Sequence, residues 1–344
     1  MLPSHLPEPD LYRPGTGEPS LRWGIAGPGW IAGEFTKALK AHTNQQVVAV
    51  SSRAQERGAA FAAEHGLSLT FGSVEQMAAH PEVDVVYIAT PPSDHVISGL
   101  AVIAAGKHVM IEKPFTVSAA QAHQLADAAR AAGVLAMEGM WNRYLPQTSV
   151  LRKLLDDGVL GEVRTLLADH GQAIPADPQH RLYRPELGGG ALMDIGIYPM
   201  AFSSFVLGPP RQVTAIGSMT DTGVDAQSTI VLQHAGGAQS TLFSSIVGRT
   251  PSTATVAGSE ASLTFGEYFY TPTTFTLRGP GHFDPVLSWS DPSGLTQFEA
   301  LSWEATALAT FVGQGRTESP VHTLSEITQI MDTIDQARAQ IAAS

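Results

Sequence analysis

Short apolar segments alternate with longer amphipathic ones between Leu21 and Glu138. Each apolar run has the length of a buried strand, and each amphipathic run has the period of a helix that covers one face of a sheet. This alternation is typical of βαβ units. We therefore predict an α/β fold whose first domain, residues 21–141, is a Rossmann-type, doubly wound parallel sheet. The expected strands are 21–27, 46–52, 83–90, 108–112 and 134–138, and the expected helices are 30–42, 55–66 (ending at Gly66), 93–106 (capped by Ser93 or Asp94) and 118–133.

After Trp141 the pattern changes to β-type runs separated by Gly, Asp and Thr turns. Such runs indicate a large, mostly antiparallel open sheet with one solvated face. We predict an α+β domain over residues 142–344 that binds substrate and forms the dimer, whose terminal helix is a candidate to pack back on the first domain. A second subunit on the uncovered face would give a homodimer or a dimer of dimers. The expected strands are 162–170, 212–219, 227–234, 239–247, 253–259 and 261–266, and the expected helices are 146–161, one from near Gly190, 303–315 and 325–342.

Composition narrows the class of protein. The chain has 344 residues, 43% of them hydrophobic, and a formal net charge of −12 at pH 7. This length exceeds what one hydrophobic core usually serves, so two domains are expected. The negative field repels phosphate backbones and anionic lipids, so we expect no nucleic-acid partner and no membrane partner. The absence of cysteine excludes disulfides, thiolate metal sites and thiol nucleophiles.

Residues 1–20 are rich in Pro and Gly, so we expect an extended arm that orders only by docking on a neighbour. Their prolines and acids do not fit a secretory signal, and we expect no later segment to be long and apolar enough to span a bilayer. We therefore expect the protein to be cytoplasmic. The 12 histidines show no ligand spacing with carboxylates on one helix face, so no metal site is expected.

A glycine-rich turn follows the first strand in "GIAGPGWIAG". Gly27, Gly29 and Ala32 have the G-x-G-x-x-A spacing that lets the backbone and a helix N-terminus approach a pyrophosphate. The alternative is an ordinary Gly-rich turn, but the place at the first βα turn favours dinucleotide binding. The residues predicted to contact the cofactor here are Gly27, Gly29, Trp30, Ile31 and Ala32.

The second strand ends in "VSSRAQER", where an NAD-preferring site would place Asp or Glu. Ser52, Arg53 and Arg57 instead offer hydroxyl and guanidinium donors, and guanidinium suits a 2′-phosphate. We predict that NADP(H) is preferred and that NAD(H) is accepted less well. The alternative is that Arg53 is a solvated cation.

Two further turns lie at the carboxyl edge of the expected sheet, where ligands of such sheets bind. "ATPPSDH" offers Thr90, Pro91, Pro92 and His95 to the nicotinamide side, with His95 equally well explained as a packing residue. "HVMIEKPF" places Glu112 and Lys113 one strand further on. Burial there would make the ammonium of Lys113 easier to deprotonate, as acid–base chemistry requires. The alternative is a solvated Glu–Lys pair worth ~0–1 kcal/mol.

The stretch "ELGGGALMDIGIYPM" gives a side-chain-free entry to a helix. Asp194 and Tyr198 are four residues apart and share one helical face, which is unusual for polar groups on an apolar helix. The alternative makes Asp194 a structural acceptor and Tyr198 a packed ring. Pro199 removes a backbone donor, so a kink is expected there.

These motifs together, "GPGWIA", "TPPSDH", "EKP" and "GGGALMDIGIYP", resemble the glucose-fructose oxidoreductase, inositol dehydrogenase and rhizopine-catabolism (Gfo/Idh/MocA) family over nearly the whole chain from Leu21. Many members carry D-x-x-x-H on the later helix, and here Tyr198 stands at the histidine position. With a tyrosine at this position, the chain resembles the branch that contains dimeric dihydrodiol dehydrogenase, NADP-dependent xylose dehydrogenase and glucose-fructose oxidoreductase. It also resembles some 3-ketoreductases that act on nucleotide-linked sugars.

The resemblance implies an NADP(H)-dependent oxidoreductase that acts on a secondary alcohol or carbonyl of a sugar or a trans-dihydrodiol. Lys113 would lie between cofactor and substrate, Tyr198 would exchange the proton, and Asp194 would hold a substrate hydroxyl or orient Lys113. In an alternative assignment, Lys113 exchanges the proton and Tyr198 polarises the substrate oxygen. By analogy, the pocket would be lined by Trp141, Arg143 and Tyr183, and the first two would also contact the cofactor. The alternative from another class is a non-catalytic NADP(H) sensor or regulatory protein.

Overall fold

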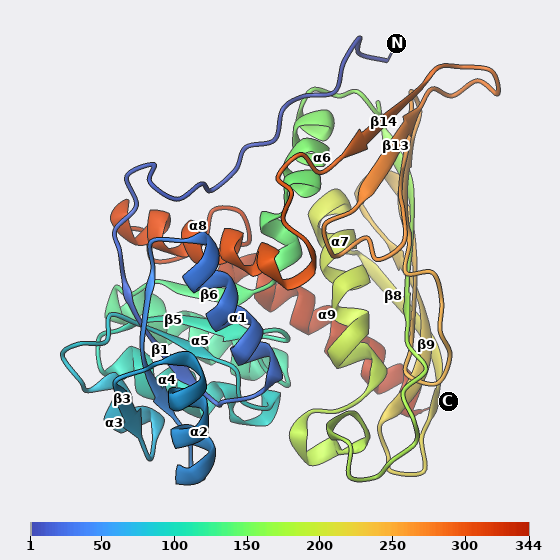
Figure 1. Ribbon diagram of the computed structural model, residues 1–344. Coiled ribbons are helices and arrows are strands. Elements are labelled where there is room, and N and C mark those ends of the chain that lie inside the picture. Colours follow the sequence, from blue (N-terminus) through green and yellow to red (C-terminus); the bar gives the residue numbers. More distant parts are fainter. Residues whose placement is uncertain (1, 344) are drawn as a thin grey trace. The chain divides into compact units, whose positions relative to one another are not determined.

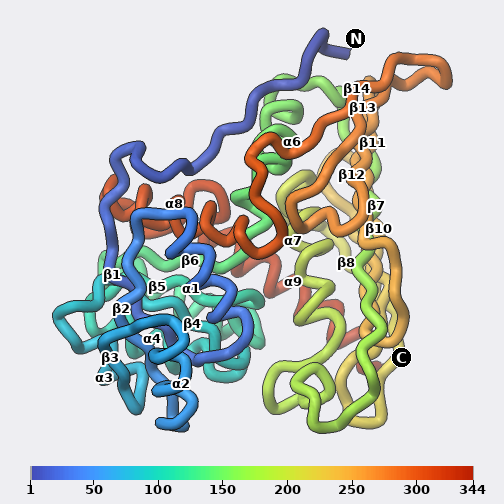
Figure 2. The backbone as a smooth tube through the Cα atoms, in the orientation of Figure 1, coloured from blue at the N-terminus to red at the C-terminus, as the bar shows by residue number. Residues whose placement is uncertain are grey.

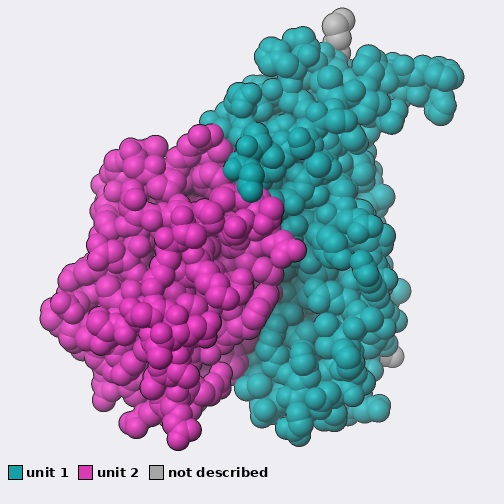
Figure 3. All heavy atoms as spheres, viewed as in Figure 1, with its two compact units in different colours: residues 1–10, 145–294, 329–344 teal, residues 11–144, 295–328 magenta. Residues whose placement is uncertain are grey.

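The computed structural model describes residues 2–343 and divides into two compact units (Figure 3). We name them the parallel-sheet unit, which combines residues 11–144 and 295–328, and the mixed-sheet unit, which combines the residues up to 10, 145–294 and those from 329. This division differs from the predicted one in two ways. Segment 295–328 groups with the first unit, and the arm is divided between the two. Of the predicted arm, Met1 lies outside the described residues.

The parallel-sheet unit contains a six-stranded sheet in the order β3-β2-β1-β4-β5-β6 (Figure 1). All its pairs are parallel. The order reverses between β1 and β4, so the carboxyl ends of these two strands border the crevice where such sheets bind ligands. The strands are β1 (Arg22–Ala26), β2 (Gln46–Ser51), β3 (Leu69–Phe71), β4 (Val85–Ile88), β5 (His108–Glu112) and β6 (Ala136–Gly139).

The helices of this unit follow the amphipathic runs of the sequence. They are α1 (Trp30–His42), α2 (Gln55–His65), α3 (Val74–Ala78), α4 (His95–Ala104), α5 (Ala119–Ala132) and α8 (Leu301–Gly313). Helix α2 ends at Gly66, whose φ of 62° is left-handed, as predicted. The predicted side-chain cap of α4 is wrong. Asp94 is itself helical at the end of a 3₁₀ turn, and its carboxylate contacts Arg53 instead.

Large rings fill the core of the parallel-sheet unit. Phe35 stacks on Tyr87 with 4.0 Å between ring centroids and lies 5.4 Å from the ring of Trp23. All three are fully buried, and burying such a side chain stabilises a fold by about 1.5–3 kcal/mol. The indole N–H of Trp23 donates to Oε1 of Gln45 at 3.1 Å, so the polar edge of the ring is also satisfied.

The mixed-sheet unit contains an eight-stranded sheet in the order β14-β13-β12-β11-β7-β10-β9-β8. Its pairs are antiparallel except for β7 with β10. The predicted open, mostly antiparallel sheet is therefore confirmed, and two further strands, β13 and β14, extend it at one end. The strands are β7 (Val163–Gly171), β8 (Gln212–Met219), β9 (Asp225–Gln233), β10 (Gln239–Ser245), β11 (Ala254–Gly258), β12 (Ser262–Phe265), β13 (Thr274–Arg278) and β14 (Val286–Ser290).

Helices cover one face of this sheet, and Figure 1 shows no helix on its other face among the described residues. They are α6 (Pro146–Asp156), α7 (Ile197–Leu207) and most of α9 (Leu324–Ala342). The end of α9 is fastened to β8, because the amide of Gln340 bonds both the carbonyl of Val213 and the N–H of Ala215. The terminal helix thus groups mainly with the mixed-sheet unit, and only residues 324–328 belong to the other.

The arm runs without helix or strand over its described residues, as Figure 2 traces. Lys153 on α6 bonds the carbonyl of Glu8 and the carboxylate of Asp10, both at 2.7 Å. Further along, the ring of Tyr12 packs edge-on against Tyr144 and Phe311 in the parallel-sheet unit. The arm therefore docks on its own chain.

One segment is long and apolar enough to cross a membrane by length and composition, so the prediction that none exists was wrong. It is Pro185–Leu207, with 23 residues and a mean hydropathy of 1.4, and 78% of its apolar window is buried inside the protein. Burial of that extent is typical of a core helix.

Candidate active site

The glycine-rich turn after β1 has the geometry of a phosphate cradle. Gly27 has a φ of +89°, and a Cβ there would lie 3.0 Å from the carbonyl of Ala89 and from Thr90, so no other residue fits. At Gly29 a Cβ would meet nothing within 4 Å. Gly29 also caps α1 without any side-chain hydrogen bond. Open space therefore lies beside the N-cap of the helix, and the first N–H groups of a helix without a side-chain cap suit an anionic pyrophosphate.

The end of β2 carries no carboxylate. Ser51 ends the strand with a buried hydroxyl that has no hydrogen-bond partner among the described residues. Arg53 holds its side chain 85% exposed and reaches Asp94 at 3.2 Å, while Arg57 is exposed on α2. An exposed ion pair of this kind is worth ~0–1 kcal/mol, so a phosphate can displace it at small cost.

The turns after β4 and β5 are joined by a buried histidine. The imidazole of His95 lies 2.9 Å from the carbonyl of Thr90 through Nε2 and 3.0 Å from the carbonyl of Pro114 through Nδ1. It is fully buried, and burial lowers the pKa of His95 from its usual range. His95 is thus engaged with the backbone of both turns, which favours the packing alternative over cofactor contact. The hydroxyl of Thr90 is buried without a partner among residues 2–343.

Lys113 follows the last residue of β5 and is partly buried. Its N–H donates to the carboxylate of its neighbour Glu112 at 3.1 Å, and Glu112 also accepts a hydrogen bond from the phenol of Tyr87. Glu112 is therefore a structural acceptor at the end of the strand. Lys113 stands at the carboxyl edge of the sheet, as predicted from the sequence, one strand beyond the turn that follows β4 and two strands from the glycine-rich turn.

Two of the predicted pocket residues follow β6 in the 3₁₀ turn Trp141–Tyr144. Trp141 stacks on Phe298 with 5.7 Å between centroids, and Trp30, 66% exposed, meets the edge of the same ring at 4.7 Å. The guanidinium of Arg143 bonds Glu326 through two nitrogens, each at 2.9 Å, and is buried. These bonds give Arg143 a structural role, and its predicted contact with a ligand stays a prediction.

Glu326 belongs to a buried chain of ionisable groups that sequence patterns did not reveal. Nδ1 of His322 lies 3.2 Å from Glu326, and Nε2 of His322 lies 2.8 Å from Glu138. Burial alone would lower the pKa of His322, but these two carboxylates outweigh burial and raise it. Burial raises the pKa of Glu326, whereas His322 and Arg143 together lower it to about 2.

Asp194 lies in a π-helical turn, Leu192–Gly196, that leads directly into α7. Its carboxylate is paired with Arg181 at 2.9 Å and is 13% exposed. The backbone enters this turn through Gly190, with a φ of +117°, where a Cβ would lie 2.2 Å from Oδ1 of Asp225. The expected irregularity near Pro199 thus takes the form of a π turn before it, a feature that is frequent at functional sites.

Tyr198, on the first turn of α7, lies in a ladder of rings. Tyr270 stacks between its neighbours, 4.6 Å from the centroid of Tyr198 and 4.3 Å from that of His170. His170 is anchored by a 3.0 Å contact from Nδ1 to the carbonyl of Ile195. The ladder fixes the plane of the Tyr198 ring. Sequence reasoning missed His170 and Tyr270 because only the folded sheet brings them to α7.

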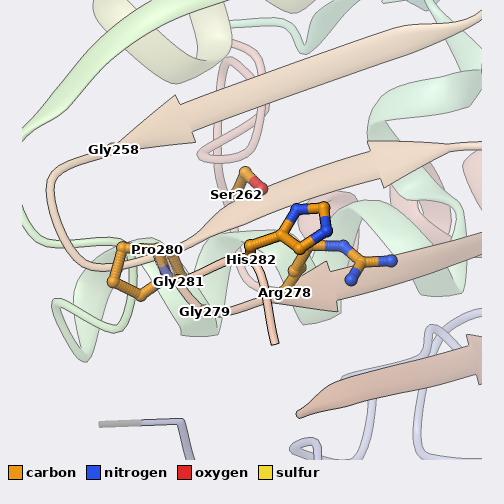
Figure 4. Close-up of a pocket in the computed structure, with 8 residues that line it drawn as sticks. Gly258, Ser262, Arg278, Gly279, Pro280, Gly281 and His282 are labelled. Atoms are coloured by element: carbon orange, nitrogen blue, oxygen red, sulfur yellow. The ribbon is translucent and has the colours of Figure 1, made fainter. Parts of the chain in front are cut away.

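Tyr183, predicted to line the pocket, is buried in an apolar cluster and donates its hydroxyl to the carbonyl of Ile174 at 2.9 Å. Its hydroxyl is therefore committed to the backbone. A hollow elsewhere on this unit, at the turn after β13, is drawn in Figure 4 and contains none of the predicted site residues. No group of three or more His, Asp or Glu side chains within residues 2–343 has the geometry of a metal site.

The predicted site residues therefore fall into two groups. The parallel-sheet unit holds the glycine-rich turn, Arg53, the turn at Thr90 and Lys113, all at or near the carboxyl edge of one sheet. The mixed-sheet unit holds Asp194 and Tyr198 at the start of α7. The first group fits a dinucleotide, and the second offers a carboxylate and a phenol to a hydroxylated ligand.

Comparison with known proteins agrees with this division. Residues 21–140 match the oxidoreductase family with an NAD-binding Rossmann fold, and residues 148–264 match the Gfo/Idh/MocA C-terminal domain. The chain is 32% identical to trans-1,2-dihydrobenzene-1,2-diol dehydrogenase of Sus scrofa, over 94% of this chain and 98% of that protein.

Solved structures show the same fold. The 3-ketoreductase KijD10 of Actinomadura kijaniata, in complex with NADP and TDP-benzene, is 26% identical and superposes with a TM-score of 0.82 over 94% of this chain and 98% of that one. An NAD-binding oxidoreductase of Klebsiella pneumoniae has a TM-score of 0.85 at 22% identity over the same shares, which shows the fold alone. With its dinucleotide fold, its second sheet and relatives matched along nearly its whole length, this chain belongs to the Gfo/Idh/MocA family of oxidoreductases.

Proposed function

We propose that this oxidoreductase uses NADP(H) and acts on a secondary alcohol or carbonyl of a cyclic diol, with a trans-dihydrodiol or a sugar as substrate. The observation that carries the proposal is the glycine-rich turn. Its open Gly29, its uncapped helix and its place at the strand-order reversal fit a pyrophosphate. The relative from Sus scrofa is named for a trans-dihydrodiol, and KijD10 was crystallised with NADP.

The preference for NADP(H) rests on the end of β2. A carboxylate there would bind both ribose hydroxyls and repel a 2′-phosphate, whereas Ser52 and the exposed guanidinium of Arg53 can bind one. The ion pair between Arg53 and Asp94 is weak enough to open when the 2′-phosphate of the cofactor binds.

In the proposed reaction, Tyr198 takes the hydroxyl proton of the substrate while the C–H bond of the same carbon breaks and a carbonyl forms. When bound, NADP(H) accepts or supplies the hydride at its nicotinamide ring. The positive charge of Lys113 stabilises the phenolate and polarises the substrate oxygen. Asp194 holds the neighbouring hydroxyl of the diol, and Arg181 orients that carboxylate. Reduction of a ketone runs through the same steps in reverse.

A substrate panel tests the proposal. Purified enzyme is assayed with NADP⁺ and trans-1,2-dihydrobenzene-1,2-diol or a pentose, and with NADPH and keto sugars, and NADPH binding is followed by fluorescence. We expect turnover of at least one vicinal diol or ketone, and a loss of roughly 10²- to 10⁴-fold in kcat/KM for Lys113→Met with NADPH still bound. Binding of NADPH without turnover of any compound would favour the sensor alternative.

We further propose a homodimer formed through the uncovered face of the eight-stranded sheet. The outward positions on the central strands β7 and β10 are uncharged apart from Asp169, and they include Leu167, which is 49% exposed. The edge strand β8 adds Ile216, which is 64% exposed. A flat face with few charges is typical of an interface with a second copy. Light scattering is expected to give a dimer for the wild type and a monomer for Leu167→Glu. A monomeric wild type would contradict this proposal.

A further inference from the structure

The peptide bond between Pro114 and Phe115, directly after Lys113, is held at both its polar groups by buried side chains. The carbonyl of Pro114 lies 3.0 Å from Nδ1 of His95, and the N–H of Phe115 donates to Oε1 of Glu138 at 2.7 Å. His95 and Glu138 are 0% and 2% exposed. Because both polar groups belong to one rigid plane, the two side chains fix the position and the tilt of that plane.

Glu138 cannot turn away from Phe115, because its other oxygen is also engaged. Oε2 lies 2.8 Å from Nε2 of His322, whose Nδ1 contacts Glu326 at 3.2 Å. Glu326 in turn is held by two bonds from Arg143. Each member is oriented by the next, so the carboxylate of Glu138 has one defined direction.

The end of strand β5 does not require a buried carboxylate and a buried imidazole for its stability. The segment is already packed by the fully buried ring of Phe115, so an apolar side chain at position 138 would fill the same volume. A carboxylate and an imidazole buried here instead specify the backbone orientation. The residue they orient is adjacent to Lys113, and displacement of a reacting group by about 1 Å can lower a rate roughly 100-fold.

We propose that Glu138, oriented by His322, is a positioning residue: together with His95 it grips the Pro114–Phe115 peptide and so sets where the ammonium of Lys113 stands. The proposal rests on the proposed function of Lys113. It predicts that Glu138 affects the rate of turnover and leaves cofactor affinity unchanged.

The test compares three variants with the wild type. Glu138→Met removes both bonds of the carboxylate and keeps the volume. Glu138→Gln keeps an acceptor for Phe115, and the tautomer of His322 can change so that Nε2 accepts from the new amide. The matched control is Gln45→Met, because Oε1 of Gln45 accepts the backbone N–H of Leu21 at 3.0 Å at the opposite end of the sheet.

With the best substrate of the panel, Glu138→Met is expected to lower kcat about 10- to 100-fold while the Kd for NADPH changes less than about threefold. Glu138→Gln is expected to recover kcat to within about fivefold of the wild type. Gln45→Met is expected to lower the melting temperature and to keep the wild-type kcat. If Glu138→Met does not fold, His322→Leu takes its place in the test. For His322→Leu we expect about a tenfold loss in kcat with unchanged NADPH affinity.

Wild-type kcat in Glu138→Met or in His322→Leu overturns the positioning role. So does a kcat loss in Gln45→Met equal to that in Glu138→Met, because general destabilisation would then explain both. An inactive Lys113→Met beside a fully active Glu138→Met would leave the proposed function intact and remove only this inference. Full activity of Lys113→Met would refute the proposed function first.

Discussion

Glu304, on α8, allows a quantitative test of the electrostatics of the parallel-sheet unit. It is fully buried, and neither of its carboxyl oxygens has a hydrogen-bond partner among the described residues. Burial, followed by the negative charges of Glu112 and Glu138, raises the pKa of Glu304 well above its usual 4.5. The folded chain therefore retains a proton that the unfolded chain releases.

The sign of the effect follows from that difference. A carboxyl group with a raised pKa contributes its full stability below the unfolded value of 4.5 and loses it as the pH rises toward the folded pKa. Within that window the wild type loses about 1.4 kcal/mol of unfolding free energy for each pH unit. Glu304→Gln has nearly the same shape and does not titrate, so it avoids this loss. We expect its stability relative to the wild type to rise by about that amount per unit from pH 5 upward.

Urea unfolding of both proteins at pH 5, 6, 7 and 8 measures this difference. The matched control is Glu75→Gln, on helix α3 of the same unit. The side chain of Ser73 lowers the pKa of Glu75, so this carboxylate stays ionised throughout the range and the effect of its replacement should be independent of pH. A stability difference for Glu304→Gln that is constant from pH 5 to pH 8 would refute the reasoning.

Three further variants test the site. Arg53→Gln should weaken NADP⁺ binding at least tenfold and leave NAD⁺ binding within about threefold, as measured by titration, and equal losses would contradict the phosphate role. Arg181→Met, which removes the 2.9 Å partner of Asp194, should raise the KM of the diol about tenfold in steady-state assays, because the guanidinium then no longer orients that carboxylate, and an unchanged KM would contradict the role of the pair. Gly190→Ala, whose Cβ would lie 2.2 Å from Asp225 at a φ of +117°, should cost about 2 kcal/mol or more in urea unfolding.

Local patterns were sufficient for most of the fold. The run of residues 30–42 predicts α1 to the residue, and Gly66 and Gly133 mark the ends of α2 and α5 by their left-handed backbone. Short elements were missed because they carry too few residues to show a period. Strand β3 has three residues, and β13 and β14 lie between Gly, Pro and Asp turns whose pairing is decided by the sheet.

The site was predictable only where one segment carries it. Gly27, Gly29 and Lys113 lie at strand ends, and strand ends can be read from the sequence. Contacts between distant segments could not be read in that way. Glu138 and His322 are 184 positions apart, and only the folded unit joins them. The same limit explains Arg143 and Tyr183, whose types suit a pocket but whose polar groups bond Glu326 and a backbone carbonyl.

The proposed function requires Lys113 and Tyr198 to act on the same substrate oxygen. A double-mutant cycle of Lys113→Met and Tyr198→Phe, measured as kcat/KM with the best substrate of the panel, is the decisive test of that requirement. We predict that the double variant is impaired about as much as the worse single variant. Losses that simply multiply, or a single variant with wild-type kcat/KM, would contradict this requirement.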